Sequence, residues 1–274
     1  MDTPLPSSSN GEMAPGNTAV DIPAVLLVGG MGTRLRSVWP SAPKPLASVG
    51  NRSFLELLVR QLRYQGIRRL VMCTGYLADQ IENEFGDGRD WDVEIVYSRE
   101  PEPLGTAGAV KLAARHLHGT ATFLVMNGDS FLEVDFAELA QFHRAHRGLA
   151  TLAAREVQNA GRFGTVLVDA GGRVTGFLEK TGSERPGLVN AGVYVFDRAM
   201  FDHIAAGPGS LERDVFPQLL GRGIFAREQR GMFIDIGTPE DFARAQDLCD
   251  RLYHAAGPQQ GDGWLQVKSE AESG

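Results

Sequence analysis

A glycine-rich loop is the first segment of this sequence whose composition suits a polyphosphate. Gly29, Gly30 and Gly32 follow directly on an apolar run at residues 24–28, which predicts a buried strand. Glycines allow a tight turn and let backbone N–H groups approach phosphate oxygens. Arg34 adds a planar, permanent cation that suits phosphate. A purely structural turn would explain the glycines, but such a turn has no use for this arginine.

Lys44 is a second candidate for contact with phosphate. It stands between Pro43 and Pro45, and the stiff backbone of the prolines lowers the entropic cost of aiming its side chain. The loop does not match the better-known nucleotide-binding loops. No Gly-Lys-Ser/Thr of a Walker A motif follows it, and its Gly-Gly-x-Gly-Thr-Arg spacing differs from the Gly-x-Gly-x-x-Gly of dinucleotide-binding folds.

Two aspartates could hold a divalent cation beside that loop. Asp129 comes shortly after an apolar run at 122–126, and Asp235 has an isoleucine on either side. A charge among apolar neighbours is costly unless it is paired or binds a metal. Mg²⁺ takes few protein ligands and fills its shell from phosphate and water, so two carboxylates would suffice. Each aspartate alone is equally well explained by a turn or a helix cap; together with the loop, the two predict an Mg²⁺ site.

Alternating strands and helices must position these groups. The first half of the sequence predicts strands and helices in turn, at 24–28, 54–66, 70–73, 78–85, 93–97, 106–117, 122–126 and 136–143. Such alternation favours a mainly parallel sheet covered by helices on both faces, with ligands at the carboxyl ends of its strands.

After about residue 150 the pattern changes to closely spaced strands. These are expected at 149–154, 164–168, 173–178 and 190–196, with a hairpin turn at 169–172 and helices at 211–220 and 239–253. We expect an α/β fold with a Rossmann-like, mixed, mainly parallel sheet in a single domain over residues 21–255. Residues 1–20 and 256–274 contain too few large apolar side chains to offset the entropy of ordering, so both are expected to be disordered tails.

Composition narrows the classes of function. The chain has 274 residues and a formal net charge of −7, and it lacks a basic run, which argues against a nucleic-acid binder. It lacks an apolar run of the ~20 residues that span a membrane, and its first residues lack the pattern of a signal peptide, so we expect a cytoplasmic protein. Cys73 and Cys249 stand far apart in apolar surroundings, which predicts buried thiols. A homo-oligomer is compatible with the sequence.

The order of the motifs resembles that of the sugar-1-phosphate nucleotidyltransferases. The run at 25–46 is similar to the signature of that family, and the later family motifs follow in order as Leu104-Gly105-Thr106-Ala107-Gly108, Asn127-Gly128-Asp129, Glu179-Lys180, Asn190-Ala191-Gly192-Val193-Tyr194 and Asp235-Ile236-Gly237-Thr238-Pro239-Glu240. The resemblance covers residues 24–248 and implies the nucleotide-diphospho-sugar transferase fold. Within the family, the sequence most resembles the short bacterial D-glycero-α-D-manno-heptose 1-phosphate guanylyltransferases, and it is also similar to uridylyltransferases that act on N-acetylmuramate 1-phosphate.

The resemblance implies a role for each candidate residue. The loop from Gly29 to Arg34, with Gly30, Gly32 and Thr33, would hold the β- and γ-phosphates, and Lys44 would lie near the α-phosphate. Asp129 and Asp235 would bind Mg²⁺. Glu100, Gly105 and Thr106 would lie on the nucleotide side at the edge of the base. Lys180 would hold the sugar phosphate, and Glu179, Gly164 and Asn190 would contact sugar hydroxyls. Catalysis would rest on Arg34, Lys44, Asp129 and Lys180.

The expected partners are a nucleoside triphosphate and a sugar 1-phosphate, in the first place GTP and the heptose phosphate. A carboxylate at Glu100 could accept hydrogen bonds from guanine N1–H and its amino group, but it could also accept the N3–H of uracil. A UTP- or dTTP-dependent enzyme acting on N-acetylmuramate or glucose 1-phosphate therefore stays open. So does a catalytically silent relative that senses nucleotide or sugar phosphate. A nicotinamide-dependent oxidoreductase is disfavoured, because the dinucleotide fingerprint and its acidic ribose ligand are missing.

Overall fold

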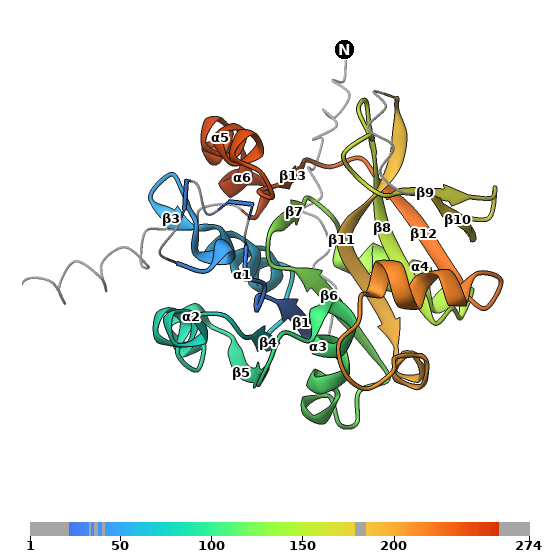
Figure 1. Cartoon of the computed structure of the whole chain (residues 1–274), viewed down its shortest axis with the longest axis horizontal. Coiled ribbons are helices and arrows are strands. Elements are labelled where there is room, and N and C mark those ends of the chain that lie inside the picture. Colours follow the sequence, from blue (N-terminus) through green and yellow to red (C-terminus); the bar gives the residue numbers. More distant parts are fainter. Residues whose placement is uncertain (1–21, 33, 36–37, 40–41, 179–184, 258–274) are drawn as a thin grey trace, which may run out of the picture.

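A computed structural model describes residues 22–32, 34–35, 38–39, 42–178 and 185–257. Both expected tails lie almost wholly outside these residues, as do Thr33, Glu179 and Lys180. In the described chain, helices and strands alternate in the first half and closely spaced strands dominate from residue 150 (Figure 1). None of the described helices combines the length and the hydrophobicity needed to cross a membrane.

One large sheet forms the middle of the molecule. Its strands within the described residues are β1 (Ala24–Leu27), β4 (Arg69–Thr74), β5 (Glu94–Arg99), β6 (Thr122–Asn127), β8 (Ala150–Val157), β9 (Thr165–Val168), β10 (Val174–Leu178), β11 (Gly187–Asp197) and β12 (Ile224–Gln229). The order runs β10-β9-β11-β6-β1-β4-β5, and β8 pairs with both β11 and β12. Strands β6, β1, β4 and β5 are parallel neighbours, whereas β11 is antiparallel to β6 and to β8. The mixed, mainly parallel sheet expected from the sequence is confirmed.

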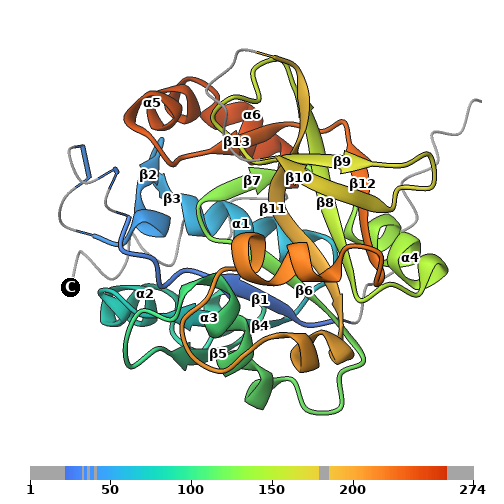
Figure 2. The same ribbon diagram turned by 45° about the vertical axis from the view of Figure 1, so that its right-hand side comes forward.

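Helices cover both faces of this sheet (Figures 1 and 2). The helices of the described chain are α1 (Phe54–Tyr64), α2 (Ala78–Phe85), α3 (Gly105–Ala113), α4 (Phe136–His146), α5 (Pro239–Asp247) and α6 (Cys249–Ala255). Residues of α1, α2, α4 and α6 share one apolar cluster, whereas residues of α3 belong to a second cluster. The period of two along β1 explains the division, because Leu26 lies in the first cluster and Val25 in the second.

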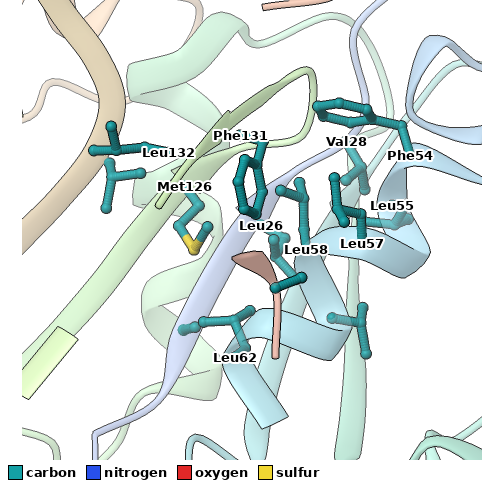
Figure 3. Packing of buried hydrophobic residues seen from close by; sticks show 14 of the residues in the cluster. Leu26, Val28, Phe54, Leu55, Leu57, Leu58, Leu62, Met126, Phe131 and Leu132 are labelled. Atoms are coloured by element: carbon teal, nitrogen blue, oxygen red, sulfur yellow. The ribbon is translucent and has the colours of Figure 1, made fainter. Parts of the chain in front are cut away.

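The core beneath α1 anchors both the glycine-rich loop and the turn that carries Asp129. In Figure 3, Phe54, Leu57 and Leu58 of α1 belong to one cluster with Leu26 of β1, Met126 of β6 and Phe131, which follows β6 in the chain. All six side chains are fully buried. Each such side chain stabilises the fold by about 1.5–3 kcal/mol when it leaves water. The loop after β1 and the turn after β6 are therefore anchored from the same side.

Three predictions on local structure need correction. The closing helix expected at 239–253 is two helices that meet at Leu248, and the expected helix at 211–220 is a π-helical turn (Leu211–Val215) followed by a 3₁₀ turn (Phe216–Leu219). Proline at 217 lacks the N–H that an α-helix would need there, although Ser210 does cap the segment by accepting from Arg213 N–H. Cys73 is buried as expected, whereas Cys249 is half-buried; both are free thiols.

Candidate active site

Two short strands that the sequence did not predict bring the acidic residues together. Strand β7 (Ser130–Leu132) pairs antiparallel with β13 (Phe233–Asp235), and Ser130 lies opposite Asp235. The backbone N–H of Ile236 donates to the carbonyl oxygen of Asp129 at 2.9 Å, which extends the pairing by one step. This pairing brings Asp129 and Asp235, which are 106 positions apart in the sequence, to the end of the sheet that also carries the glycine-rich loop.

Lys44 joins this acidic pair. It begins a 3₁₀ turn (Lys44–Leu46), its side chain is buried, and its Nζ lies 2.6 Å from Asp129 Oδ2. The Asp235 carboxylate accepts a hydrogen bond from Gly237 N–H at 2.6 Å. Burial, reinforced by the negative charge of Asp129, raises the pKa of Asp235 to about 6, although Lys44 and Gly237 act in the opposite direction. The site thus carries more negative charge than one ammonium neutralises.

That excess of negative charge is what a divalent cation would relieve. Among the described residues, His, Cys, Asp and Glu form no group of three or more that could enclose a metal by themselves. A pair of carboxylates fits Mg²⁺ better than a metal that needs a full shell of protein ligands, because Mg²⁺ retains water and phosphate ligands. Asp129 and Asp235 would hold the ion, and Lys44 would share the neutralisation of phosphate charge.

The glycine-rich loop lies against both the lysine and the expected base side. Gly32 has a φ of +56°, and a Cβ there would lie 2.9 Å from Lys44 Cβ, so only glycine allows this approach without strain. Gly29 lies against Glu100, because a Cβ at 29 would be 2.7 Å from Glu100 Oε1. Gly30 has open space around it, and the side chain of Arg34 is exposed. The loop therefore leaves its outer side accessible to a ligand.

The predicted base side is built from the end of β5 and the start of α3. Glu100 follows β5, and its Oε2 accepts a hydrogen bond from Leu104 N–H at 2.8 Å; burial raises the pKa of this carboxyl. Gly105 has a φ of +66° and packs on the carbonyl of Gly209. The hydroxyl of Thr106 donates to Glu212 at 3.1 Å and accepts from Leu211 N–H. Thr106 is thus held within the protein.

The predicted sugar side is described in part. Asn190 of β11 donates through Nδ2 to the Tyr194 hydroxyl at 2.8 Å, and its Oδ1 accepts from Gly192 N–H at 3.1 Å. Gly164 is exposed just before β9. Its loop is tied to α5, because Arg162 makes two hydrogen bonds to Asp241 in the first turn of that helix, at 2.7 and 2.9 Å. Glu179 and Lys180 lie outside the described part of the chain.

Sequence reasoning missed two residues that the structure places beside the candidates. Tyr194 is fully buried and Glu212 is half-buried, and both bond to predicted site residues. Tyr194 belongs to a motif noted above, so its hydroxyl was a visible signal. Glu212 had a weaker one, as one of two acidic residues, with Asp214, that follow the helix-capping Ser210.

Comparison with known proteins gives a consistent set of relatives. A mannose-1-phosphate guanylyltransferase of Mycobacterium tuberculosis is 41% identical over 227 residues, which cover 81% of this chain and 63% of that protein. The catalytic subunit beta of mannose-1-phosphate guanylyltransferase from Drosophila melanogaster is 36% identical, over 80% of this chain and 60% of its own. This chain thus spans less than two thirds of the length of either relative.

Solved structures agree with the fold. HddC from Yersinia pseudotuberculosis, in complex with GMP-PN, superposes with a TM-score of 0.73 at 30% identity, over 82% of this chain and 98% of that one. A putative glucose-1-phosphate thymidylyltransferase from Bacillus anthracis reaches a TM-score of 0.77 at 21% identity, which supports the fold alone. The family model for nucleotidyl transferases matches residues 23–251. The chain therefore belongs to the nucleotidyl transferase family.

Proposed function

We propose that the chain transfers a guanylyl group from GTP to a sugar 1-phosphate and releases pyrophosphate. The observation that carries this proposal is the ion pair between Lys44 and Asp129, next to the β7–β13 pairing that holds Asp235 and beside a glycine-rich loop at the end of the parallel strands. The arrangement supplies cationic and metal-binding groups where a triphosphate would lie. Relatives named as guanylyltransferases support the reaction class.

In the proposed reaction, a phosphate oxygen of the sugar 1-phosphate attacks the α-phosphorus of GTP. A new P–O bond forms there as the bond from the α-phosphorus to the bridging oxygen of pyrophosphate breaks. The nucleophile is already an anion at neutral pH, so no general base is needed. Lys44 would neutralise charge at the α-phosphate, and Arg34, at the exposed edge of the loop, would reach the outer phosphates. Mg²⁺ held by Asp129 and Asp235 would supply further charge neutralisation.

Glu100 supports guanine as the base. Its Oε2 is held by Leu104 N–H and its Oε1 lies at Gly29, so the carboxylate is fixed at the edge of the loop. Guanine offers two adjacent donors, N1–H and the amino group, whereas uracil and thymine offer N3–H alone. A fixed carboxylate with two oxygens makes better use of two donors. GTP is therefore preferred over UTP or dTTP in this proposal.

For the sugar, we propose a ring of manno configuration. D-glycero-α-D-manno-heptose 1-phosphate, expected from the sequence, and mannose 1-phosphate, the substrate in the names of the relatives, share that ring. Asn190 supports such a contact, because among the described residues only one proton of its Nδ2 is bonded, to Tyr194, which leaves the other for a hydroxyl of the ligand. A cytoplasmic location and a homo-oligomer stay predictions.

The test is pyrophosphate release with Mg²⁺, in which GTP, UTP, dTTP, CTP and ATP are each combined with mannose, heptose, glucose and N-acetylmuramate 1-phosphates. Turnover with GTP and a manno sugar is the expected result. Turnover with another pair would refute the proposed specificity and keep the mechanism. Nucleotide binding without turnover on any pair would refute the proposed reaction and favour a ligand-sensing relative.

A further inference from the structure

Glu212 stands at the centre of a hydrogen-bonded network between the base side and the sugar side. The network consists of Thr106 at the start of α3, Ser210 and Glu212 in the π-helical segment, and Tyr194 and Asn190 on β11. These residues come from three separate parts of the chain. Their side chains meet on the face of the sheet covered by α3, to which Tyr194 contributes its fully buried ring.

Every proton in the network has a defined direction. The Glu212 carboxylate accepts hydrogen bonds from three hydroxyls. Thr106 at 3.1 Å and Ser210 at 2.9 Å donate to Oε2, and Tyr194 at 3.1 Å donates to Oε1. The Thr106 oxygen accepts a hydrogen bond from the backbone N–H of Leu211, and its own proton is donated to Glu212. In the same way, the Tyr194 oxygen accepts from Asn190 Nδ2 at 2.8 Å while its proton is donated to Glu212. The carboxylate thus sets the orientation of each hydroxyl.

The same carboxylate indirectly orients the amide of Asn190. Because the Tyr194 proton points to Glu212, only an N–H of Asn190 can satisfy the phenol oxygen. The Gly192 N–H bonded to Asn190 Oδ1 agrees with that orientation. The second N–H of Nδ2 is then presented as a donor.

Backbone contacts join the network to the base side as well. Gly209 N–H donates to the Leu104 carbonyl at 2.9 Å, and Ala107 N–H donates to the Gly209 carbonyl at 3.0 Å. The segment that carries Glu212 is thereby fixed to the first turn of α3, beside the Leu104 N–H that holds Glu100. A displacement of Glu212 would disturb both sides at once.

We propose that Glu212 is a positioning residue that couples the nucleotide side to the sugar side. This inference rests on the proposed function, since it takes Asn190 as a contact of the sugar and the start of α3 as a contact of the nucleotide. Under this proposal, a change on one side weakens the ligand on the other. A carboxylate that served packing alone would not produce that crossed effect.

The experiment compares Thr106→Val, Tyr194→Phe, Glu212→Ala and Glu212→Gln with wild type, by steady-state kinetics with GTP and the sugar 1-phosphate that wild type accepts. Thr106→Val is expected to raise KM for the sugar phosphate about tenfold, and Tyr194→Phe to raise KM for GTP by a similar factor, because hydrogen bonds to charged groups have about that strength. Glu212→Ala should raise both, and Glu212→Gln should fall between Ala and wild type. Glu138→Gln breaks an exposed ion pair with Arg227 far from the network and serves as the control.

Two results would overturn the proposal. The two sides are independent if Thr106→Val changes only KM for GTP and Tyr194→Phe changes only KM for the sugar phosphate. The network is merely structural if the variants lower the melting temperature while folded protein keeps both KM values. If wild type is silent with every substrate pair, the proposed function fails separately. Calorimetric titration with GTP alone then decides, since Tyr194→Phe must still weaken GTP binding about tenfold.

Discussion

His143 should make the stability of the fold fall steeply as the pH drops below 6.5. It lies on α4 with its ring buried, and its Nδ1 is 3.0 Å from the hydroxyl of Thr151, which is also buried, on β8. Burial lowers the pKa of His143 to about 4; Arg144 acts in the same direction, and Asp197 opposes them. In the unfolded chain the ordinary value of about 6.5 applies.

The sign and size follow from proton linkage. Between pH 6.5 and 4 the unfolded state binds a proton at His143 that the folded state does not, so the stability present above pH 6.5 is lost as the pH falls. A shift of one pKa unit corresponds to about 1.4 kcal/mol. At pH 5, about 1.5 units below the unfolded pKa, the loss is about 2 kcal/mol relative to pH 7.

The assay is urea unfolding at pH 7 and pH 5 for wild type, His143→Gln and His146→Gln. Glutamine at 143 can still bond to Thr151 but does not titrate. His146 packs on Phe142, with ring centroids 4.0 Å apart, and controls for the loss of a histidine from the same helix. Other titrating groups, including Asp235, are present in all three proteins and cancel in the comparison. Equal losses for wild type and His143→Gln between the two pH values would refute the reasoning.

Three further predictions concern the site. Asp129→Asn should lower kcat at least about a thousandfold with little change in the urea midpoint, and EDTA should abolish turnover until Mg²⁺ is restored; near-normal turnover of a folded variant would remove Asp129 from the metal site. Gly105→Ala should cost about 3 kcal/mol in urea unfolding, because a Cβ would meet the Gly209 carbonyl at a φ of +66°. The control is Gly119→Ala, at a φ of +74° with nothing near its Cβ, which measures the cost of backbone strain alone. If both variants lose the same free energy of unfolding, the collision with the Gly209 carbonyl is refuted. Gly29→Ala should reduce the preference for GTP over UTP about tenfold, since its Cβ would lie 2.7 Å from Glu100 Oε1; an unchanged ratio of kcat/KM would argue against Glu100 as the selector of guanine.

The sequence predicted those elements whose local pattern agrees with their place in the fold. The strand at 24–28 and the helix Ala78–Phe85 were recognised because burial on one or both of their faces requires apolar residues at regular positions in the sequence. The break at Leu248 was not, because no proline or glycine marks it and the apolar positions continue across it.

The parts of the site that escaped prediction depend on contacts between distant residues. Strands β7 and β13 have three residues each, too few for a period of two to show. Glu212 looks like a solvated helix residue in the sequence, and its importance appears only when Thr106 and Tyr194 arrive from elsewhere. The glycine-rich loop and the two aspartates could be proposed from the sequence because their residue types and local spacing suggest their chemistry, whereas their mutual placement depends on the tertiary fold.

The pairing of β7 with β13 has a consequence for how this scaffold could be redesigned. The distance between the two carboxylates is set by a backbone ladder, Ser130 opposite Asp235 and Ile236 N–H on the Asp129 carbonyl, and not by the side chains that surround a sugar. The loop that carries Gly164 contacts α5, which follows β13 in the chain, through the ion pair between Arg162 and Asp241. A grafted loop that keeps this arginine would retain the contact with α5, and the backbone ladder would keep Asp129 and Asp235 in place. The proposed acceptor side could then be changed without moving the two aspartates.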